Sequence, residues 1–119
     1  MPHLVMEYTG NLALDAQPAL LRLNQALLAS GHFQENAIKA RAVRHEHFLV
    51  GTDTQAQRAF IALRLAILAG RSLEDKKRIA DLLGAAMRRD LDLPAGTQVQ
   101  ITVEVTDMQS ETYYKVSLQ

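Results

Sequence analysis

The sequence contains no cysteine and no tryptophan, and its aromatic residues number only three phenylalanines and three tyrosines. Without cysteine the chain can form neither a disulfide nor a thiolate metal site. So few aromatic rings argue against a surface that stacks RNA bases. The formal net charge is zero, because 13 acidic residues balance 13 basic ones. Neither a nucleic acid nor an anionic membrane is therefore expected as the main partner.

Long hydrophobic runs are also lacking, and no stretch approaches the length that spans a bilayer. The N-terminus has no basic region and opens directly into a strand pattern, so no cleavable signal peptide is predicted. We therefore expect a cytoplasmic protein. Apolar residues make up 48% and charged residues 22% of the 119 residues, which is ordinary for a globular protein. This length predicts a single domain over residues 1–119.

Hydrophobic periodicity predicts four strands and two helices. The predicted strands are Leu4–Tyr8, Ala37–Val50, Phe60–Leu68 and a last strand over 99–105. One predicted helix runs from a cap at Asp15 to Ser30, and Gly31 ends it. The other follows Ser72, which stands three residues before Asp75 as in a capping box. Residues 112–118 are expected to form a short extended tail.

The predicted order is strand, helix, strand, strand, helix, strand, which divides into two βαβ-like halves of similar length. This order indicates an α+β fold with a four-stranded mixed sheet and both helices on one face. The strand Phe60–Leu68 carries apolar residues on both of its sides. Two helices can cover only one of these sides, so the other is expected to pack on another subunit. The sequence thus predicts an obligate oligomer.

Pro2 is the first candidate for chemistry. A small residue in second place normally allows removal of Met1, which would leave Pro2 with a free secondary amine. An α-amino group has an ordinary pKa of about 7.7–8.0, nearer neutrality than that of any lysine. Burial or a neighbouring cation would lower this pKa toward the value that suits a general base at pH 7. On position alone, a tolerated residue at the start of a strand is the simpler interpretation.

Basic residues are the second candidates. Arg71 stands where a strand meets a helix N-terminus, a junction that favours anions. Arg41 lies in mid-strand on the same side as Lys39, which is unusual unless that side is wet or binds a ligand. A guanidinium binds a carboxylate through two parallel hydrogen bonds. For a single arginine, a solvated surface group is the commoner alternative.

Two further clusters give weaker signals. His45 and His47 share one side of a strand and could hold a metal, but no third ligand is evident. Polar residues at an exposed strand end are the simpler interpretation, so no metal site is predicted. Residues 113–115 (Tyr-Tyr-Lys) could line a pocket or cover an edge strand, and the sequence does not decide between these.

Three segments, MPHLVMEYTGNL, AIKARAVRHEHFLVG and AFIALRLAILAGRSLEDKKRIADLLGAAM, carry a resemblance to a known family. They resemble 5-carboxymethyl-2-hydroxymuconate delta-isomerase, of the tautomerase superfamily that includes 4-oxalocrotonate tautomerase and macrophage migration inhibitory factor. The resemblance covers nearly the whole chain in order and spacing, and is weakest over residues 107–119. It implies a βαββαβ protomer assembled as a homotrimer, with the sheets facing inward.

The resemblance also implies a cofactor-independent isomerase with neither metal nor organic cofactor, whose base is Pro2 after removal of Met1. Arg71 and either Lys39 or Arg41 would bind substrate carboxylates. Arg41 is preferred because a planar fork suits a carboxylate better than an ammonium. The implied substrate is 5-carboxymethyl-2-hydroxymuconate or a related unsaturated dicarboxylate from aromatic-compound catabolism. Two alternatives remain: a superfamily member acting on another enol or haloacid, and a non-catalytic ferredoxin-like binding module.

Overall fold

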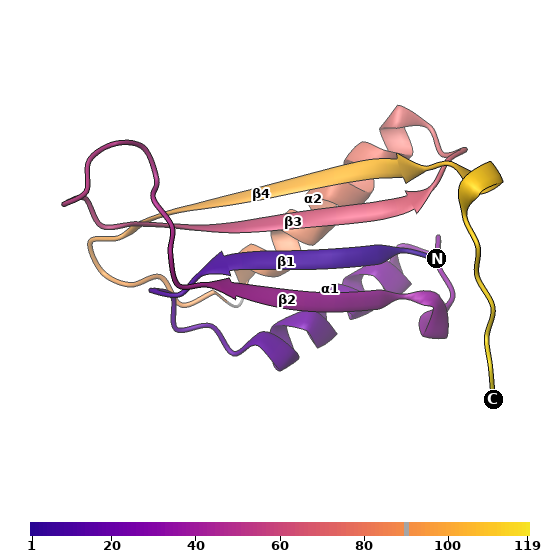
Figure 1. Cartoon of the computed structure of the whole chain (residues 1–119), viewed down its shortest axis with the longest axis horizontal. Helices are drawn as coiled ribbons and strands as arrows, with labels where there is room; N and C mark the ends of the chain where they lie inside the picture. The colour runs from indigo at the N-terminus through magenta and orange to yellow at the C-terminus, as the bar shows by residue number, and fades with distance from the viewer. Residues whose placement is uncertain (90) are drawn as a thin grey trace.

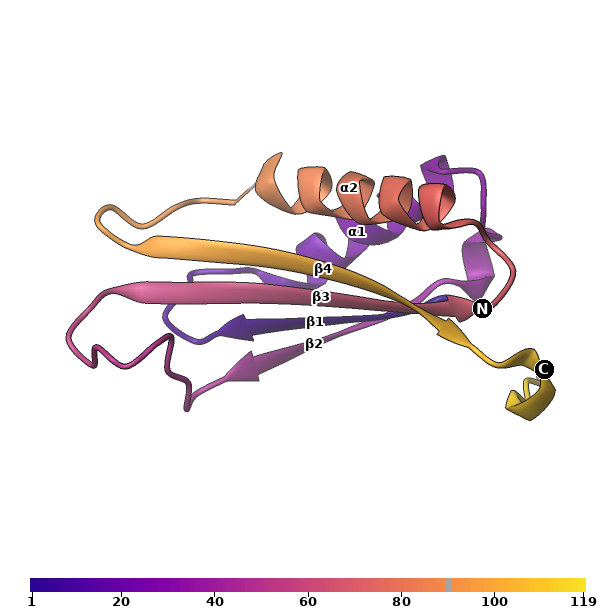
Figure 2. The same ribbon diagram turned by 90° about the horizontal axis from the view of Figure 1, so that it is seen from above.

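The structure, a computed structural model that describes residues 1–89 and 91–119, is a four-stranded sheet with two helices on one face (Figures 1 and 2). The sheet order is β2-β1-β3-β4. Its elements follow the chain as β1 (His3–Thr9), α1 (Ala16–Ala29), β2 (Lys39–His45), β3 (Arg58–Leu68), α2 (Leu73–Arg89) and β4 (Gln98–Met108), with short 3₁₀ turns at Glu35–Ala37 and Ser110–Thr112.

The two halves predicted from the sequence are present as two βαβ units. β1 is parallel to β2, and β3 is parallel to β4, with one helix crossing between the members of each pair. The halves join through the antiparallel pair β1–β3 at the centre of the sheet. The βαββαβ fold and the mixed sheet are therefore confirmed.

The predicted strand Ala37–Val50 is wrong at both ends, because β2 covers only Lys39–His45. β2 is an edge strand whose single neighbour is β1, and β1 ends at Thr9. The last bond between the two segments runs from the Gly10 amide to the His45 carbonyl at 2.8 Å. Residues 46–57 then have no strand to pair with and form a long loop.

The core lies between the helices and one face of the sheet, and its fully buried side chains come from β1, α1, β3 and α2. These residues are Leu4, Met6, Leu23, Leu27, Ile61, Leu63, Leu65, Ile67, Ile79 and Leu83. α1 buries a narrow face made by Ala19, Leu23 and Leu27, while Leu21 and Leu28 are 58% and 43% exposed. Ser72 caps α2 as predicted, because its Oγ accepts a hydrogen bond from the Asp75 amide at 3.0 Å. Asp15 precedes α1 without a side-chain cap bond.

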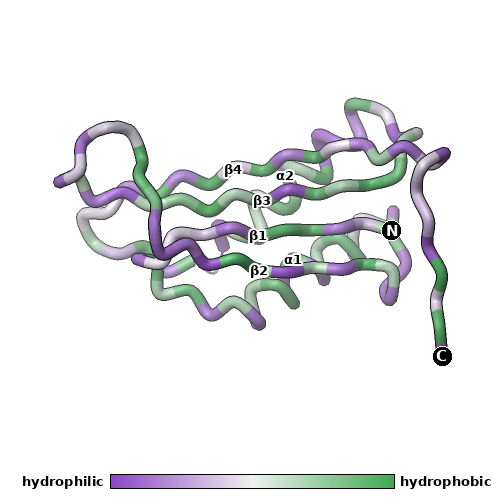
Figure 3. The backbone as a smooth tube through the Cα atoms, viewed as in Figure 1, coloured by the Kyte–Doolittle hydropathy of each residue, from purple (hydrophilic) through white to green (hydrophobic). Residues whose placement is uncertain are grey.

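In the part of the chain that the structure describes, no helix or strand covers the second face of the sheet (Figure 2). Figure 3 shows hydrophobic and hydrophilic residues along the strands of the sheet. On the open face, β3 carries Phe60, Ala62, Ala66 and Leu68 together with Arg64, so this face is mixed rather than apolar. Arg64 lies in the middle of the apolar residues of β3 on this face and is 67% exposed at its side chain. The expectation that β3 is apolar on both sides therefore holds for its flanks and fails at Arg64.

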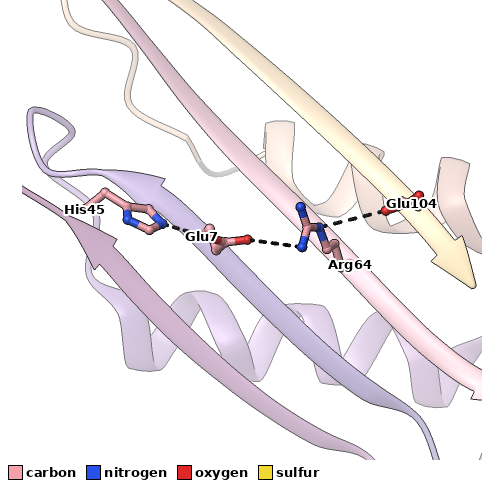
Figure 4. A network of polar contacts seen from close by, with 4 residues as sticks. All are labelled: Glu7, His45, Arg64 and Glu104. Carbon is pink, nitrogen blue, oxygen red and sulfur yellow. Dashed lines mark hydrogen bonds and ion pairs between the residues drawn. The ribbon is translucent and has the colours of Figure 1, made fainter. Parts of the chain in front are cut away.

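A row of polar contacts crosses the open face from β2 to β4 (Figure 4). His45 Nε2 lies 2.9 Å from Glu7 Oε1, and Glu7 Oε2 lies 4.0 Å from Arg64 Nη1. Arg64 Nε lies 3.8 Å from Glu104 Oε1. We call these four residues the charged row.

Among the described residues, no helix is long and apolar enough to cross a bilayer.

Candidate active site

A pocket of about 200 Å³ lies at the end of the sheet where the chain begins. Its walls come from the N-terminus, the segment before β2, the end of β3, the start of α2 and the C-terminal tail. The lining residues are Met1, His32, Phe33, Gln34, Ala37, Ile67, Leu68, Arg71 and Lys115. A larger hollow of about 520 Å³ lies under the loop 48–58 at the opposite end of the sheet. That hollow contains none of the predicted site residues, so the N-terminal pocket is the better candidate.

Pro2 directly precedes β1 at this end of the sheet, and its side chain is fully buried. Its carbonyl accepts a hydrogen bond from the Lys39 amide at 3.1 Å, which aligns β1 with β2. With Met1 attached, the Pro2 nitrogen is an amide nitrogen and has no proton affinity to offer. The free amine then belongs to Met1, which lines the pocket and donates to the Ala37 carbonyl at 3.1 Å.

The amine at this position is less basic than an ordinary N-terminus. Burial, followed by the charges of Lys39, Lys115 and Arg71, lowers the pKa of the Met1 amine from 8.0 to about 6. Both causes act in the same direction, because desolvation and nearby cations each disfavour the protonated form. The Met1 amine is therefore largely unprotonated at pH 7.

Arg71 lies where the sequence places it, between β3 and α2. Gly70 precedes it with a φ of 130°, a conformation that side chains other than hydrogen rarely adopt, and so turns the chain into the pocket. The guanidinium donates to the His32 carbonyl at 3.0 Å and lies 4.9 Å from the centre of the Phe33 ring. These contacts hold the arginine in place and leave its charge without a carboxylate partner among the described residues.

Lys39 and Arg41 are separated by the structure. Lys39 Nζ donates at 2.7 Å to the Ala37 carbonyl, the same oxygen that the Met1 amine binds. Neither of the two lines the pocket, and Arg41 contacts His3 instead, with its Nη2 3.2 Å from Nδ1 of that ring. The structure thus brings the N-terminus, Lys39 and Arg71 together and leaves Arg41 on the exposed face beside them.

The C-terminal tail contributes a residue that was not among the predicted site residues. Residues 113–119 form no strand, and the tail runs past the N-terminus (Figure 1). Tyr113 anchors it, because its hydroxyl lies 2.9 Å from His3 Nε2. Lys115 follows two residues later and lines the pocket. The sequence had indicated this segment through its Tyr-Tyr-Lys run at 113–115. Of the two interpretations of that run, lining a pocket agrees with the structure better than covering an edge strand.

The lining of this pocket contains no aspartate or glutamate. In the described part of the chain, Lys39, Arg71 and Lys115 form no ion pair with a carboxylate. The whole chain is neutral, so its acidic groups lie elsewhere, and several are paired on the open face and on α2. An uncompensated group of cations around a neutral amine suits a ligand that carries carboxylates and a proton to be removed.

His45 and His47 do not form a site together. β2 ends at His45, which is bound to Glu7 in the charged row, and His47 lies in the exposed loop beyond it. Within the described ranges, no three histidine, aspartate or glutamate side chains are grouped as metal ligands.

Comparison with known proteins agrees with the sequence resemblance. The family model for 5-carboxymethyl-2-hydroxymuconate isomerase matches residues 2–118. A 5-carboxymethyl-2-hydroxymuconate isomerase from Deinococcus radiodurans R1 is 33% identical, with a TM-score of 0.83 over 98% of this chain and 90% of that one. Among curated proteins, no sequence match was found.

Two more distant structures share the fold. A 5-carboxymethyl-2-hydroxymuconate delta-isomerase is 22% identical, with a TM-score of 0.74 over 98% of this chain and 88% of that one. A fused 4-OT protein described as a symmetric trimer is 16% identical, with a TM-score of 0.68 over 93% of this chain and 91% of that one. The family match favours an enzyme over a non-catalytic binding module. The chain therefore belongs to the 5-carboxymethyl-2-hydroxymuconate isomerase family, and it is an isomerase.

Proposed function

We propose that the chain, after removal of Met1, isomerises 5-carboxymethyl-2-hydroxymuconate with the Pro2 nitrogen as general base and then general acid. The observation that carries this proposal is the environment of the N-terminal amine. The pocket lowers the pKa of that amine to about 6 and surrounds it with Lys39, Arg71 and Lys115. Removal of Met1 would move the free amine one residue inward, to a buried proline held by the β1–β2 pairing.

The reaction needs one group that accepts a proton and returns it. The neutral Pro2 nitrogen takes the proton of the 2-hydroxyl group, and the oxygen lone pair forms the C2 carbonyl as the double bonds shift along the chain. The electron pair at the far carbon of the dienol then takes the proton back from the prolinium. No atom is gained or lost, so no oxidant or reductant is required. A pKa near neutrality serves both steps.

The cations of the pocket have two roles in this scheme. They attract the carboxylates of the substrate, and they stabilise the negative charge that develops on the dienolate oxygen. Arg71, held by the His32 carbonyl and the Phe33 ring, is the best-fixed of them. Lys39 shares the Ala37 carbonyl with the N-terminus and is better placed than Arg41 to contact substrate. Because hydroxymuconates are products of aromatic ring opening, we place the enzyme in aromatic-compound catabolism.

We also propose that the enzyme is a homotrimer that covers the open face of the sheet. One relative of the same fold is described as a symmetric trimer. The apolar flanks of β3 on this face have no cover within the protomer, which supports an association through it (Figure 2).

The experiment compares two forms of the protein that differ only at the N-terminus. One form begins at Pro2, and the other retains Met1; mass spectrometry verifies each. Isomerisation of 5-carboxymethyl-2-hydroxymuconate is followed by the loss of dienol absorbance. We expect activity in the form that begins at Pro2 and little above background in the form that retains Met1.

Equal activity of the two forms would remove Pro2 from the mechanism. A panel of other enols and haloacrylates, assayed on the same samples, tests the substrate. If the form that begins at Pro2 turned over one of these compounds faster, Pro2 would remain the proposed base, and that compound would replace 5-carboxymethyl-2-hydroxymuconate as the proposed substrate.

A further inference from the structure

The C-terminal tail ends beside the N-terminal pocket, and its anchoring can be followed residue by residue. Arginine has no acceptor, so the contact of Arg41 with His3 requires Nδ1 of the imidazole to accept. Burial, followed by the charges of Arg41, Lys39 and the terminal amine, lowers the pKa of His3 and keeps the ring neutral near pH 7. The proton of the neutral ring is then on Nε2, which donates to the Tyr113 hydroxyl at 2.9 Å. Arg41 and His3 thus fix the position of Tyr113.

The rings of His3 and Tyr113 also meet edge to face, with their centres 6.1 Å apart. This second contact restricts the direction in which the tail leaves Tyr113. Two residues further on, Lys115 lines the pocket together with Met1 and Arg71. Its side chain has no hydrogen bond and no carboxylate partner among the described residues. A lysine held at a pocket mouth without a partner is available to a ligand.

The number of cations can be compared with the number of charges on the substrate. Lys39 and Arg71 belong to the strand and helix framework, and two cations are sufficient for a muconate, which is a dicarboxylate. The carboxymethyl branch adds a third carboxylate to 5-carboxymethyl-2-hydroxymuconate. Lys115 is the third cation whose charge acts on the terminal amine, after Lys39 and Arg71, and it comes from the tail. It lines the pocket together with Arg71, whereas Lys39 lies outside the lining.

We propose that Lys115 is the specificity-determining residue that binds the carboxymethyl carboxylate, so that the tail makes the enzyme selective for tricarboxylates over dicarboxylates. Tyr113 is the positioning residue that places it. This inference rests on the proposed function, since it assumes the substrate class of the pocket.

The test measures selectivity as the ratio of kcat/KM for 5-carboxymethyl-2-hydroxymuconate to kcat/KM for 2-hydroxymuconate, which lacks the branch. We expect Lys115→Met to lower this ratio by about 10- to 100-fold, as for the loss of a hydrogen bond to a charged group. The loss should fall mainly on KM for the tricarboxylate. For the dicarboxylate, kcat/KM should fall by a smaller factor, because only the effect of the Lys115 charge on the terminal amine is lost. Lys115→Arg should retain most of the selectivity.

Tyr113→Phe removes only the hydroxyl that His3 binds, and we expect it to lower the same ratio by a smaller factor. A merely structural role of Tyr113 would lower kcat/KM for both substrates alike. Two controls match the variants. Tyr114→Ala changes a neighbouring tail side chain that is 84% exposed and lies outside the pocket lining. Lys77→Met removes an exposed lysine of α2 that pairs with Asp81.

Binding provides a readout that does not depend on turnover. Calorimetry with adipate and 2-(carboxymethyl)adipate compares a saturated dicarboxylate with the matching tricarboxylate. We expect the unmodified protein, and not Lys115→Met, to bind the tricarboxylate more tightly. If the unmodified protein turned over neither hydroxymuconate but still bound the tricarboxylate more tightly, the proposed function would fail. The assignment of Lys115 to the third carboxylate would be retained. An unchanged selectivity and an unchanged binding preference in Lys115→Met would overturn the inference.

Discussion

Pro2 combines three properties that no other residue of the chain shares: a position next to the N-terminus, a fully buried side chain and a backbone carbonyl bound into the sheet. A flexible terminus would sample many directions. Pro2 can sample few, because its carbonyl is bound to β2 where the pairing of β1 with β2 begins. Its ring also fixes the backbone φ angle. Burial, the carbonyl bond and the ring together restrict the directions that a Pro2 nitrogen could take after removal of Met1.

Substitution of Pro2 tests the base directly. Pro2→Ala keeps a free amine after removal of Met1 but loses the ring that directs it and the secondary amine. We expect kcat to fall by about 10²- to 10⁴-fold, the range for loss of a general acid–base group. Steady-state kinetics on N-terminally verified protein measure the effect. An unaltered far-ultraviolet spectrum and sedimentation coefficient would show that folding and assembly are retained.

The charge of Lys39 should be visible in the pH profile. Cations beside the amine disfavour its protonation, so kcat/KM should rise with pH through an apparent pKa below the ordinary 8.0 and then reach a plateau. Lys39→Gln removes one of these cations, and the amine becomes easier to protonate. We expect the acidic limb of the profile to move to higher pH. Lys77→Gln, which changes a distant lysine on α2, should leave the limb in place.

At the residue scale, sequence reasoning selected Pro2 and Arg71 because each stands at a feature that a sequence displays, the chain start and a strand-to-helix junction. Arg71 lines the pocket, and the roles of both residues stay predictions. It preferred Arg41 to Lys39 from side-chain chemistry alone, and that preference stays a prediction. Which of the two lies beside the N-terminus depends on the turn at Glu35–Ala37, whose carbonyl at Ala37 holds Lys39. Lys115 was missed because a tail without regular structure has no periodicity to reveal where it lies.

At the scale of elements, hydrophobic alternation predicted the strands and helices, and the structure differs mainly at their ends. A strand ends where its neighbour ends, as β2 does beside β1, and periodicity within one segment contains no information about its neighbour. The junction is tight at Gly10, whose amide donates to His45. A Cβ atom on Gly10 would lie 2.9 Å from the His45 carbonyl oxygen.

Gly10→Ala should therefore destabilise the protein by about 1–3 kcal/mol, since the clash is with backbone that the hydrogen bond holds in place. Urea unfolding measures the change. Gly84→Ala, within α2, is the matched control. Its Cβ atom would lie at an ordinary contact distance of 3.7 Å from the Val103 side chain of β4. Alanine is the better helix former by about 1 kcal/mol, so this control should be neutral or stabilising. Equal losses in both variants would contradict the close approach at Gly10.

At the scale of the whole molecule, the open face is the surface through which we propose that protomers associate. In an isolated protomer Arg64 and Glu104 of the charged row are exposed, Glu7 and His45 are half-buried, and the two long contacts of Arg64 contribute little to stability. In the proposed trimer the same row would be removed from water. A charge that is buried at an interface without an opposite charge beside it is costly. The charged row would therefore restrict which surface of a neighbouring protomer can pack on the open face.

Reversal of Arg64 tests this role. Arg64→Glu places a third carboxylate between Glu7 and Glu104, and we expect the trimer to dissociate to monomers in sedimentation velocity experiments. The double variant Arg64→Glu with Glu104→Arg restores an opposite charge in the row, and should recover part of the assembly. A trimer that survives Arg64→Glu unchanged would place the interface elsewhere.

The tail beside the N-terminus has a consequence for the order in which the protein matures. Ribosomes make the N-terminus first, so Met1 is accessible to a processing aminopeptidase long before residues 113–119 exist. Once the tail has been synthesised, it settles next to the same terminus and takes part in closing the site. The proposed removal of Met1 is therefore expected to be easier before the tail takes its place beside the N-terminus than after it.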